Sequence, residues 1–119
     1  SYTTFTYGVP TVAKSTFSSQ EPITVSIDVR NTGNFDGEEV VQLYIRDIVA
    51  SVTRPVKELR GFQKVMIKKG ETKKVTFTLT KKDFEIYNQN MEKVVEPGEF
   101  HVFVGGNSDT QNKVSVTLQ

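Results

Sequence analysis

Carboxylates are the side chains in this sequence best able to do chemistry, and that chemistry would be acid–base hydrolysis. The chain has 14 Asp and Glu residues, and two carboxyl groups facing each other about 5–10 Å apart across a sugar-sized pocket can cleave a glycosidic bond. Here Asp36, Glu71 and Glu96 fall at predicted turns, and Asp28 falls on the polar face of a predicted strand. We therefore predict that the carboxylates are solvated and that this chain has no catalytic residue.

Metal and nucleophile chemistry has even fewer candidates. His101 is the only histidine, and the chain has no cysteine, which excludes disulfides, thiolate chemistry and cysteine zinc sites. His101 alternates with Phe100 and Val102, so we expect it on the outward face of its strand. One imidazole without a second ligand or a recognisable triad favours neither a metal centre nor a nucleophile. We predict no metal site and no cofactor.

Oxygen-bearing side chains cluster around one predicted loop, at Asn31, Asn34, Asp36 and Glu38. Such oxygens could hold a hard cation, but their spacing matches no calcium-binding loop that we can defend. Asn, Asp and Gly also occur in loops because they tolerate turn geometry. We favour the turn interpretation.

Lysines concentrate in residues 64–82, where seven Lys face one Glu. Lys on an edge strand guards against edge-to-edge pairing, and a contact surface for a neighbouring domain is the second interpretation. No aromatic residues are interleaved for base stacking, and the net charge is only +1. We therefore predict no nucleic-acid partner.

Two aromatic residues, Phe35 in a loop and Tyr44 opposite an apolar strand face, could stack on sugars. The chain has no Trp, and no planar row of rings is visible in the pattern. We favour packing, in the core or between domains, over sugar binding for both.

The elements that must position these residues are strands. Apolar residues alternate with polar ones in several segments, which marks strands with one buried face: Ile23, Val25, Ile27 and Val29; Val75, Phe77 and Leu79; Phe100, Val102 and Val104; Val114, Val116 and Leu118. Residues 40–46 are more apolar, which indicates a central strand partly covered on both faces. One short helical turn is predicted at residues 81–84, with Thr80 as its cap and Asp83 in its first turn.

Turn signals separate these segments, and together they predict an all-β, immunoglobulin-like antiparallel β-sandwich of 7–8 strands. At 119 residues with 36% hydrophobic residues, residues 1–119 fit a single domain. No apolar run approaches the roughly 18 residues that span a bilayer, so we predict no membrane partner. The abrupt start at Ser1 on a strand-like segment leads us to expect a piece of a longer polypeptide.

Residues 47–57 form the longest stretch without a clear face, and Pro55 interrupts it. Pro cannot donate to a strand ladder, and long connections in a compact sandwich are more often functional or docked than idle. A connection of mixed charge with apolar residues after it is what a docking surface needs.

Four segments carry a resemblance to a known family: residues 1–7, 25–47, 51–65 and 96–100. The most specific is Arg-Pro-x-Lys-Glu-Leu-x-Gly-Phe at residues 54–62. In order and spacing they resemble the fibronectin type III-like C-terminal domain of glycoside hydrolase family 3, which includes β-glucosidases and β-xylosidases. The resemblance covers essentially the whole chain, although the polar run at residues 108–113 departs from the family pattern.

The resemblance implies a non-catalytic accessory domain, because the catalytic residues of such enzymes lie in upstream domains of the same polypeptide. Those catalytic domains are the implied partner, and the parent would be a secreted or periplasmic hydrolase of terminal β-linked sugars. An independent carbohydrate-binding or adhesion-type β-sandwich, with polysaccharide as its partner, is the alternative.

The resemblance also implies which residues dock on the catalytic domains: Arg54, Pro55, Lys57, Glu58, Leu59 and Phe62. We expect Arg54, Lys57 and Glu58 to be largely exposed when this chain is alone, so that replacing Arg54 and Lys57 by Ala changes its stability by no more than about 0.5 kcal/mol. For Leu59 and Phe62, burial in the core of their own strand is the favoured alternative to docking.

Overall fold

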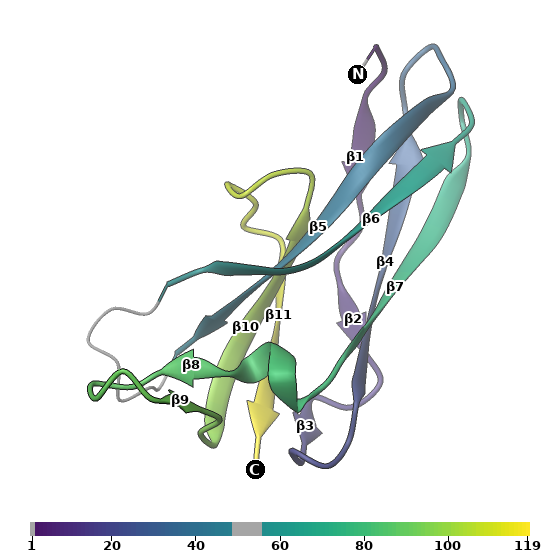
Figure 1. The fold of residues 1–119 in the computed structure, drawn as a ribbon. Helices are drawn as coiled ribbons and strands as arrows, with labels where there is room; N and C mark the ends of the chain where they lie inside the picture. Colours follow the sequence, from purple (N-terminus) through teal and green to yellow (C-terminus); the bar gives the residue numbers. More distant parts are fainter. Residues whose placement is uncertain (1, 49–55) are drawn as a thin grey trace.

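The structure is a computed structural model, and it describes residues 2–48 and 56–119. Its strands form two sheets that pack face to face (Figure 1). Sheet A contains β1 (Phe5–Tyr7), β2 (Thr11–Val12), β4 (Ile23–Asn31) and β7 (Thr72–Leu79). Sheet B has the order β3 (Thr16–Phe17), β11 (Lys113–Leu118), β10 (Gly98–Gly105), β5 (Gly37–Asp47) and β6 (Glu58–Ile67). A short hairpin of β8 (Ile86–Tyr87) and β9 (Lys93–Val94) completes the described strands.

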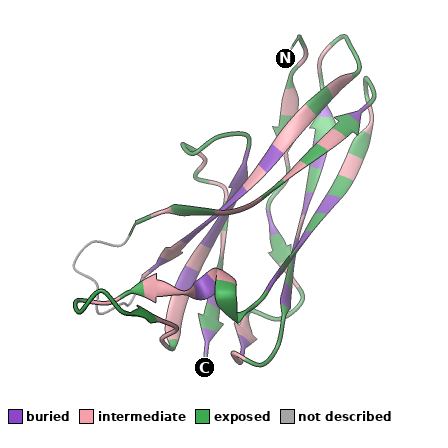
Figure 2. Ribbon diagram, in the orientation of Figure 1, coloured by how far each residue is buried: buried purple, intermediate pink, exposed green. Residues whose placement is uncertain are grey.

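The predicted alternating faces meet in the core between the sheets. β4 and β7 pair antiparallel from Ile23 opposite Leu79 to Arg30 opposite Thr72, so their apolar residues lie on one face. That face packs against the inward residues of β5, β10 and β11, and buried positions run along the strands between the sheets (Figure 2). The prediction of an antiparallel immunoglobulin-like sandwich is confirmed.

The strand count follows from how the N-terminal segment is divided. β1 and β2 pair antiparallel with β4 in sheet A, whereas β3 pairs parallel with β11 in sheet B. Residues 5–17 therefore form one edge that crosses from one sheet to the other. With that edge counted once, the two sheets have seven strands within residues 2–48 and 56–119, in agreement with the prediction, and the β8–β9 hairpin is additional.

β5 is covered on both faces, as its apolar run predicted. Val41, Leu43 and Ile45 face the core between the sheets. On the opposite face Tyr44 is only 8% exposed, and Phe103 of the neighbouring β10 is 1% exposed. Tyr44 is therefore a packing residue, and its hydroxyl donates a hydrogen bond to the Gln42 Oε1 atom.

The predicted helical turn is present as a 3₁₀ helix, η1 (Lys81–Phe84). The backbone N–H of Thr80 donates to Asp83 Oδ2 at 2.8 Å, and the N–H of Asp83 donates back to the Thr80 carbonyl at 2.9 Å. The turn buries Phe84, whose ring centroid lies 4.9 Å from that of Phe17 and 5.0 Å from that of Phe100. Across residues 2–48 and 56–119, the structure contains no helix with the length and apolar character needed to cross a membrane.

Candidate docking surface on β6

A β-bulge near the start of β6 decides which way its side chains point. Tyr44 of β5 is opposite Leu59, and the preceding residue of β5, Leu43, is opposite Gly61. Arg60 therefore has no partner on β5 and is the extra residue of the bulge. A bulge inserts one residue into a strand and re-aims the side chains around it. A Cβ built on Gly61 would lie 3.4 Å from the Phe77 ring, so Gly61 faces the core.

The bulge places an apolar stripe, defined here as Leu59, Phe62 and Met66, on the outer face of sheet B. All three are opposite residues that share one face of β5, namely Tyr44, Gln42 and Glu38. Their exposed fractions are 50%, 59% and 53%. The favoured interpretation of Leu59 and Phe62 as core residues is therefore wrong, because the bulge turns both outward. Met66 was not singled out from the sequence.

Lys57 is only partly exposed, and the expectation that it faces solvent is wrong. Its Nζ atom donates to the carbonyls of Ser108, at 2.9 Å, and Thr110. The same ammonium lies 4.3 Å from the centroid of the Phe103 ring, a cation–π distance. Burial lowers the pKa of Lys57, and the Arg46 guanidinium lowers it further. Lys57 thus holds the 106–112 loop over the outer face of sheet B.

Glu58 is exposed, as expected, and pairs with a residue that the sequence analysis did not single out. Its Oε2 atom lies 3.2 Å from an Nη atom of Arg60. The same Nη atom donates to the Glu85 carbonyl at 2.8 Å, so the bulge residue ties β6 to the segment after η1. Arg54 and Pro55 lie outside the described residues.

The oxygen-rich loop is built by Asn31, which is completely buried. Its amide Nδ2 donates to the carbonyls of Phe35 and Ile67 at 2.8 and 2.9 Å, and its Oδ1 accepts from Thr3 Oγ1 and Gly33 N–H. Asp36 accepts the Lys69 N–H at 2.7 Å. The turn interpretation therefore holds for Asn31 and Asp36.

His101 lies on the outward face of β10, as predicted. Its Nε2 atom is 3.3 Å from Glu99 Oε2, which also accepts a hydrogen bond from Ser115 Oγ at 2.6 Å. The Ser115 hydrogen bond and the neighbouring imidazole hold the pKa of Glu99 below its usual value. These three polar side chains lie on the surface of sheet B and bond to one another, which explains them structurally.

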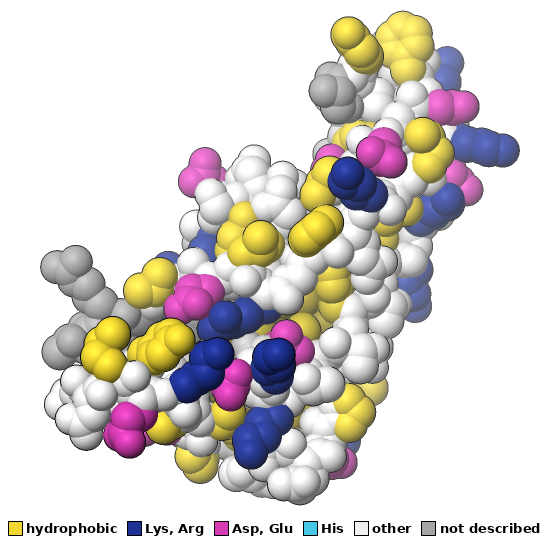
Figure 3. All heavy atoms as spheres, viewed as in Figure 1, with side chains coloured by type: hydrophobic (Ala, Val, Ile, Leu, Met, Phe, Trp, Pro, Cys, Tyr) yellow, Lys and Arg dark blue, Asp and Glu magenta, His cyan; other side chains and the backbone are white. Residues whose placement is uncertain are grey.

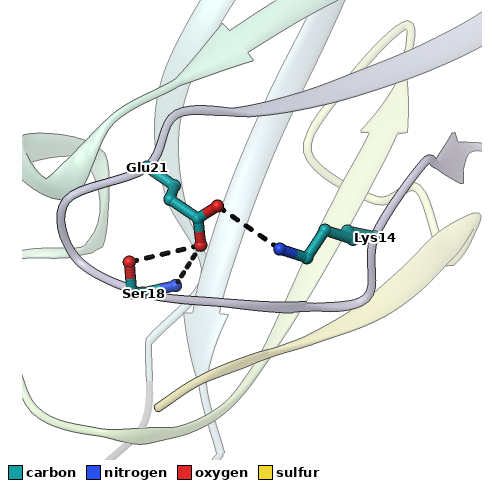
Figure 4. A network of polar contacts seen from close by, with 3 residues as sticks. All are labelled: Lys14, Ser18 and Glu21. Atoms are coloured by element: carbon teal, nitrogen blue, oxygen red, sulfur yellow. Dashed lines mark hydrogen bonds and ion pairs between the residues drawn. The ribbon is translucent and has the colours of Figure 1, made fainter.

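A second polar network closes the loop around residues 14–21 (Figure 4). Glu21 Oε1 accepts hydrogen bonds from the backbone N–H and the hydroxyl of Ser18, both at 3.2 Å, and its Oε2 lies 3.3 Å from Lys14 Nζ. The Ser18 N–H and Lys14 lower the pKa of Glu21. The carboxylate caps a turn here, so this network has a structural explanation.

Two packed antiparallel sheets of this topology define an immunoglobulin-like β-sandwich. The model of the family described as Fibronectin type III-like domain matches residues 39–108, and the chain belongs to this family.

The relatives with high similarity are glycosidases of much greater length. A beta-xylosidase of Formosa agariphila is 46% identical over 118 residues, covering 99% of this chain and 16% of its own length. The thermostable beta-glucosidase B of Acetivibrio thermocellus is 47% identical over 109 residues, covering 91% of this chain and 14% of its own length. The chain therefore corresponds to an accessory fibronectin type III-like domain and spans about one-sixth of the relatives that it matches.

Solved structures give the same result. The beta-glucosidase from Listeria innocua in complex with glucose matches with a TM-score of 0.87 and 38% identity, over 98% of this chain and 16% of that one. A β-glucosidase from Erythrobacter marinus matches with a TM-score of 0.89 and 43% identity, over 99% and 16%.

Proposed function

We propose that residues 1–119 form one accessory domain of a longer family 3 β-glycosidase and that the domain docks on the catalytic domains of that polypeptide through the stripe on β6. The observation that carries the docking proposal is the alignment of Leu59, Phe62 and Met66, each at least half exposed, on the outer face of one edge strand. Figure 3 shows hydrophobic side chains exposed among polar and charged ones on one side of the molecule.

Physical arguments favour a protein partner for this stripe. Burial of apolar surface contributes about 25 cal/mol per Å² removed from water, and interface centres are apolar with a charged rim. Lys64 is exposed and opposite Val40, so it lies on the same face between Phe62 and Met66 and adds a charged group to this surface. A neighbouring domain that covers the stripe would gain this burial without unpairing the internal bonds of Lys57 or Arg60.

The activity of the parent follows from its relatives and is part of the proposal. Those relatives are named beta-xylosidase and beta-glucosidase, so we infer a parent that hydrolyses terminal β-linked sugars. A beta-glucosidase of Salmonella typhimurium, 43% identical over 108 residues, is named periplasmic. We infer a secreted or periplasmic parent on the same basis.

The docking proposal is tested with the Leu59→Ser, Phe62→Ser double variant, made in the chain alone and in the intact polypeptide. Both positions are exposed in the chain alone, so its thermal midpoint should change little. Association with the separately produced catalytic domains should weaken about 30-fold or more, because hot-spot truncations cost about 2 kcal/mol or more. Isothermal calorimetry of the two parts measures this.

Val9→Ser is the matched control, because Val9 is 72% exposed and lies between β1 and β2 of sheet A, in the other sheet from β6. Equal association of the double variant and the unmodified chain would contradict docking through β6. Equal weakening by the control would show a general loss of apolar surface instead.

A further inference from the structure

A pocket of about 270 Å³ lies between β6, η1 and the β8–β9 hairpin. Six of its lining residues are charged, three of each sign: Arg60, Lys82 and Lys93, and Glu58, Asp83 and Glu85. Figure 3 shows basic and acidic side chains interspersed over this part of the surface, with hydrophobic ones beside them. The pocket is therefore strongly polar but has no net formal charge.

We propose that this pocket is a binding subsite for one neutral sugar ring at the end of an oligosaccharide; the choice of saccharide rests on the proposed function. Sugar hydroxyls both donate and accept hydrogen bonds, so they suit a lining that offers ammonium and guanidinium donors beside carboxylate acceptors. An anionic or cationic ligand would meet three charges of its own sign. A purely apolar ligand would leave the charged groups desolvated and unpaired.

Aromatic and aliphatic side chains supply a surface for the apolar face of the ring. Tyr87 lines the pocket and is 55% exposed, and Leu59 and Ile86 lie beside it. An exposed tyrosine presents a flat apolar body with a polar tip. Lys93 Nζ lies 6.0 Å from the centroid of the Tyr87 ring and 3.9 Å from Glu85 Oε1, which links this aromatic side chain to the charged lining.

Several polar groups of the pocket are held in place before any ligand arrives. The guanidinium of Arg60 is fixed by Glu58 and by the Glu85 carbonyl, and Asp83 is fixed by the Thr80 N–H. The ammonium of Lys82 has no hydrogen-bond or ion-pair partner among residues 2–48 and 56–119, so it is available to a ligand. Preorganised partners reduce the entropy lost on binding.

The size of the pocket limits what it can hold. Small-molecule sites are about 300–1,000 Å³, so 270 Å³ fits one ring and not a longer segment. A single ring with few contacts implies a dissociation constant in the millimolar range. The subsite would hold a chain end weakly beside Leu59, at the edge of the docking stripe.

The test is a titration of the 119-residue chain with cellobiose and, separately, xylobiose, followed by amide chemical shifts in ¹⁵N-labelled protein up to ~100 mM sugar. We expect saturating shifts confined to β8, β9, η1 and the start of β6. Tyr87→Ala and Lys82→Ala should each weaken binding about tenfold or more by removing one of these contacts. Two substitutions keep the test valid if one variant folds poorly, which the dispersion of its spectrum reveals.

Lys81→Ala is the matched control for Lys82, because Lys81 is also exposed on η1 but does not line the pocket. Non-saturating shifts spread over the surface, or unchanged binding by both pocket variants, would overturn the proposal. Absent sugar binding with weakened docking of Tyr87→Ala would assign the pocket to the protein interface instead. The docking proposal is tested separately, by the association of the Leu59→Ser, Phe62→Ser double variant with the catalytic domains.

Discussion

At the scale of single residues, Lys57 joins two segments that are distant in the sequence. Its ammonium binds carbonyls of the 106–112 loop and covers Phe103, so its removal would leave Ser108 and Thr110 without these donors. Losing hydrogen bonds to a charged group costs about 1.5–3 kcal/mol.

We predict that Lys57→Ala lowers the free energy of unfolding of this chain by about 1.5–3 kcal/mol. Urea denaturation measures the change, with Lys64→Ala as the control. Lys64 is an exposed lysine on β6, and its removal should change stability by less than about 0.5 kcal/mol. Equal stability of the two variants would return Lys57 to the solvent-facing role expected from the sequence.

Tyr7 makes another internal bond, from its hydroxyl to Glu39 Oε2 at 2.7 Å. Burial, and then the hydrogen bond and charge of Glu39, raise the pKa of Tyr7 well above its ordinary value of 10.0. In the unfolded chain this tyrosine ionises near pH 10, whereas in the folded chain it stays protonated. The contribution of Tyr7 to the free energy of unfolding is therefore fully present below pH 10 and is lost as the pH rises above 10.

We predict that the free energy of unfolding falls more steeply with pH above 10 in the unmodified chain than in Tyr7→Phe, by up to about 1.4 kcal/mol per pH unit. At pH 7 the variant should be less stable by about 1–2 kcal/mol, because Glu39 loses its donor. Denaturation at pH 7, 10 and 11 measures both effects. Tyr2→Phe is the control, since Tyr2 is 97% exposed; identical slopes for both variants would contradict the prediction.

At the scale of elements, β6 and β7 are edge strands of different sheets, and side chains bridge them. Gln63 Nε2 donates to the Thr76 carbonyl at 2.6 Å, and Lys73 Nζ donates to the Met66 carbonyl at 2.7 Å. Unpaired carbonyls on an edge strand are a template for another strand. These two bonds occupy carbonyls that an added strand would need.

We predict that the Gln63→Ala, Lys73→Ala double variant self-associates at concentrations where the unmodified chain does not. Sedimentation velocity measures the association, which should appear as dimers or larger species formed by edge pairing. Gln20→Ala, Lys81→Ala is the control, because it removes the same two residue types at exposed positions outside β6 and β7. A double variant that sediments like the control would show that these bonds do not protect the edges.

The sequence pattern predicted β4, β5, β7, β10, β11 and the helical turn because alternation and capping are local signals. It did not predict the bulge, which depends on how β6 pairs with β5. Leu59 and Phe62 are three residues apart, so in a regular strand they would face opposite sides and one would be buried. That odd spacing was the available signal, and Arg60 as the extra residue is what lets both face outward.

The two-residue strands and the candidate surface were harder to predict for the same reason. β8 and β9 are too short to show a period. Lys57 was assigned to docking from the resemblance; its bonds to residues 108 and 110, far along the chain, leave no local signal in the sequence. Leu59 and Phe62 carry the proposed surface, although burial was favoured for them.

At the scale of the whole molecule, the shape is extended for a chain of this length. Its principal extents are 50 × 26 × 18 Å and its radius of gyration is 15.4 Å, whereas a compact chain of this size would have about 13.5 Å. Figure 1 shows why: the ends of β1, β4, β5, β6 and β7 continue into a narrow arm beyond the other strands. A long, thin sandwich has a large surface area relative to the volume of its core. This shape suits a module that packs against a neighbour.

The same extended shape determines how the molecule rotates in solution. A body nearly three times as long as it is thick turns about its long axis faster than it turns end over end. Backbone N–H bonds of antiparallel strands are perpendicular to those strands, and the longest strands run along the molecule (Figure 1). Amides of β4, β5, β6 and β7 therefore share similar angles to the long axis and should relax at similar rates. An amide in these strands whose relaxation rate differs from the rate that the others share would report local motion, not overall tumbling.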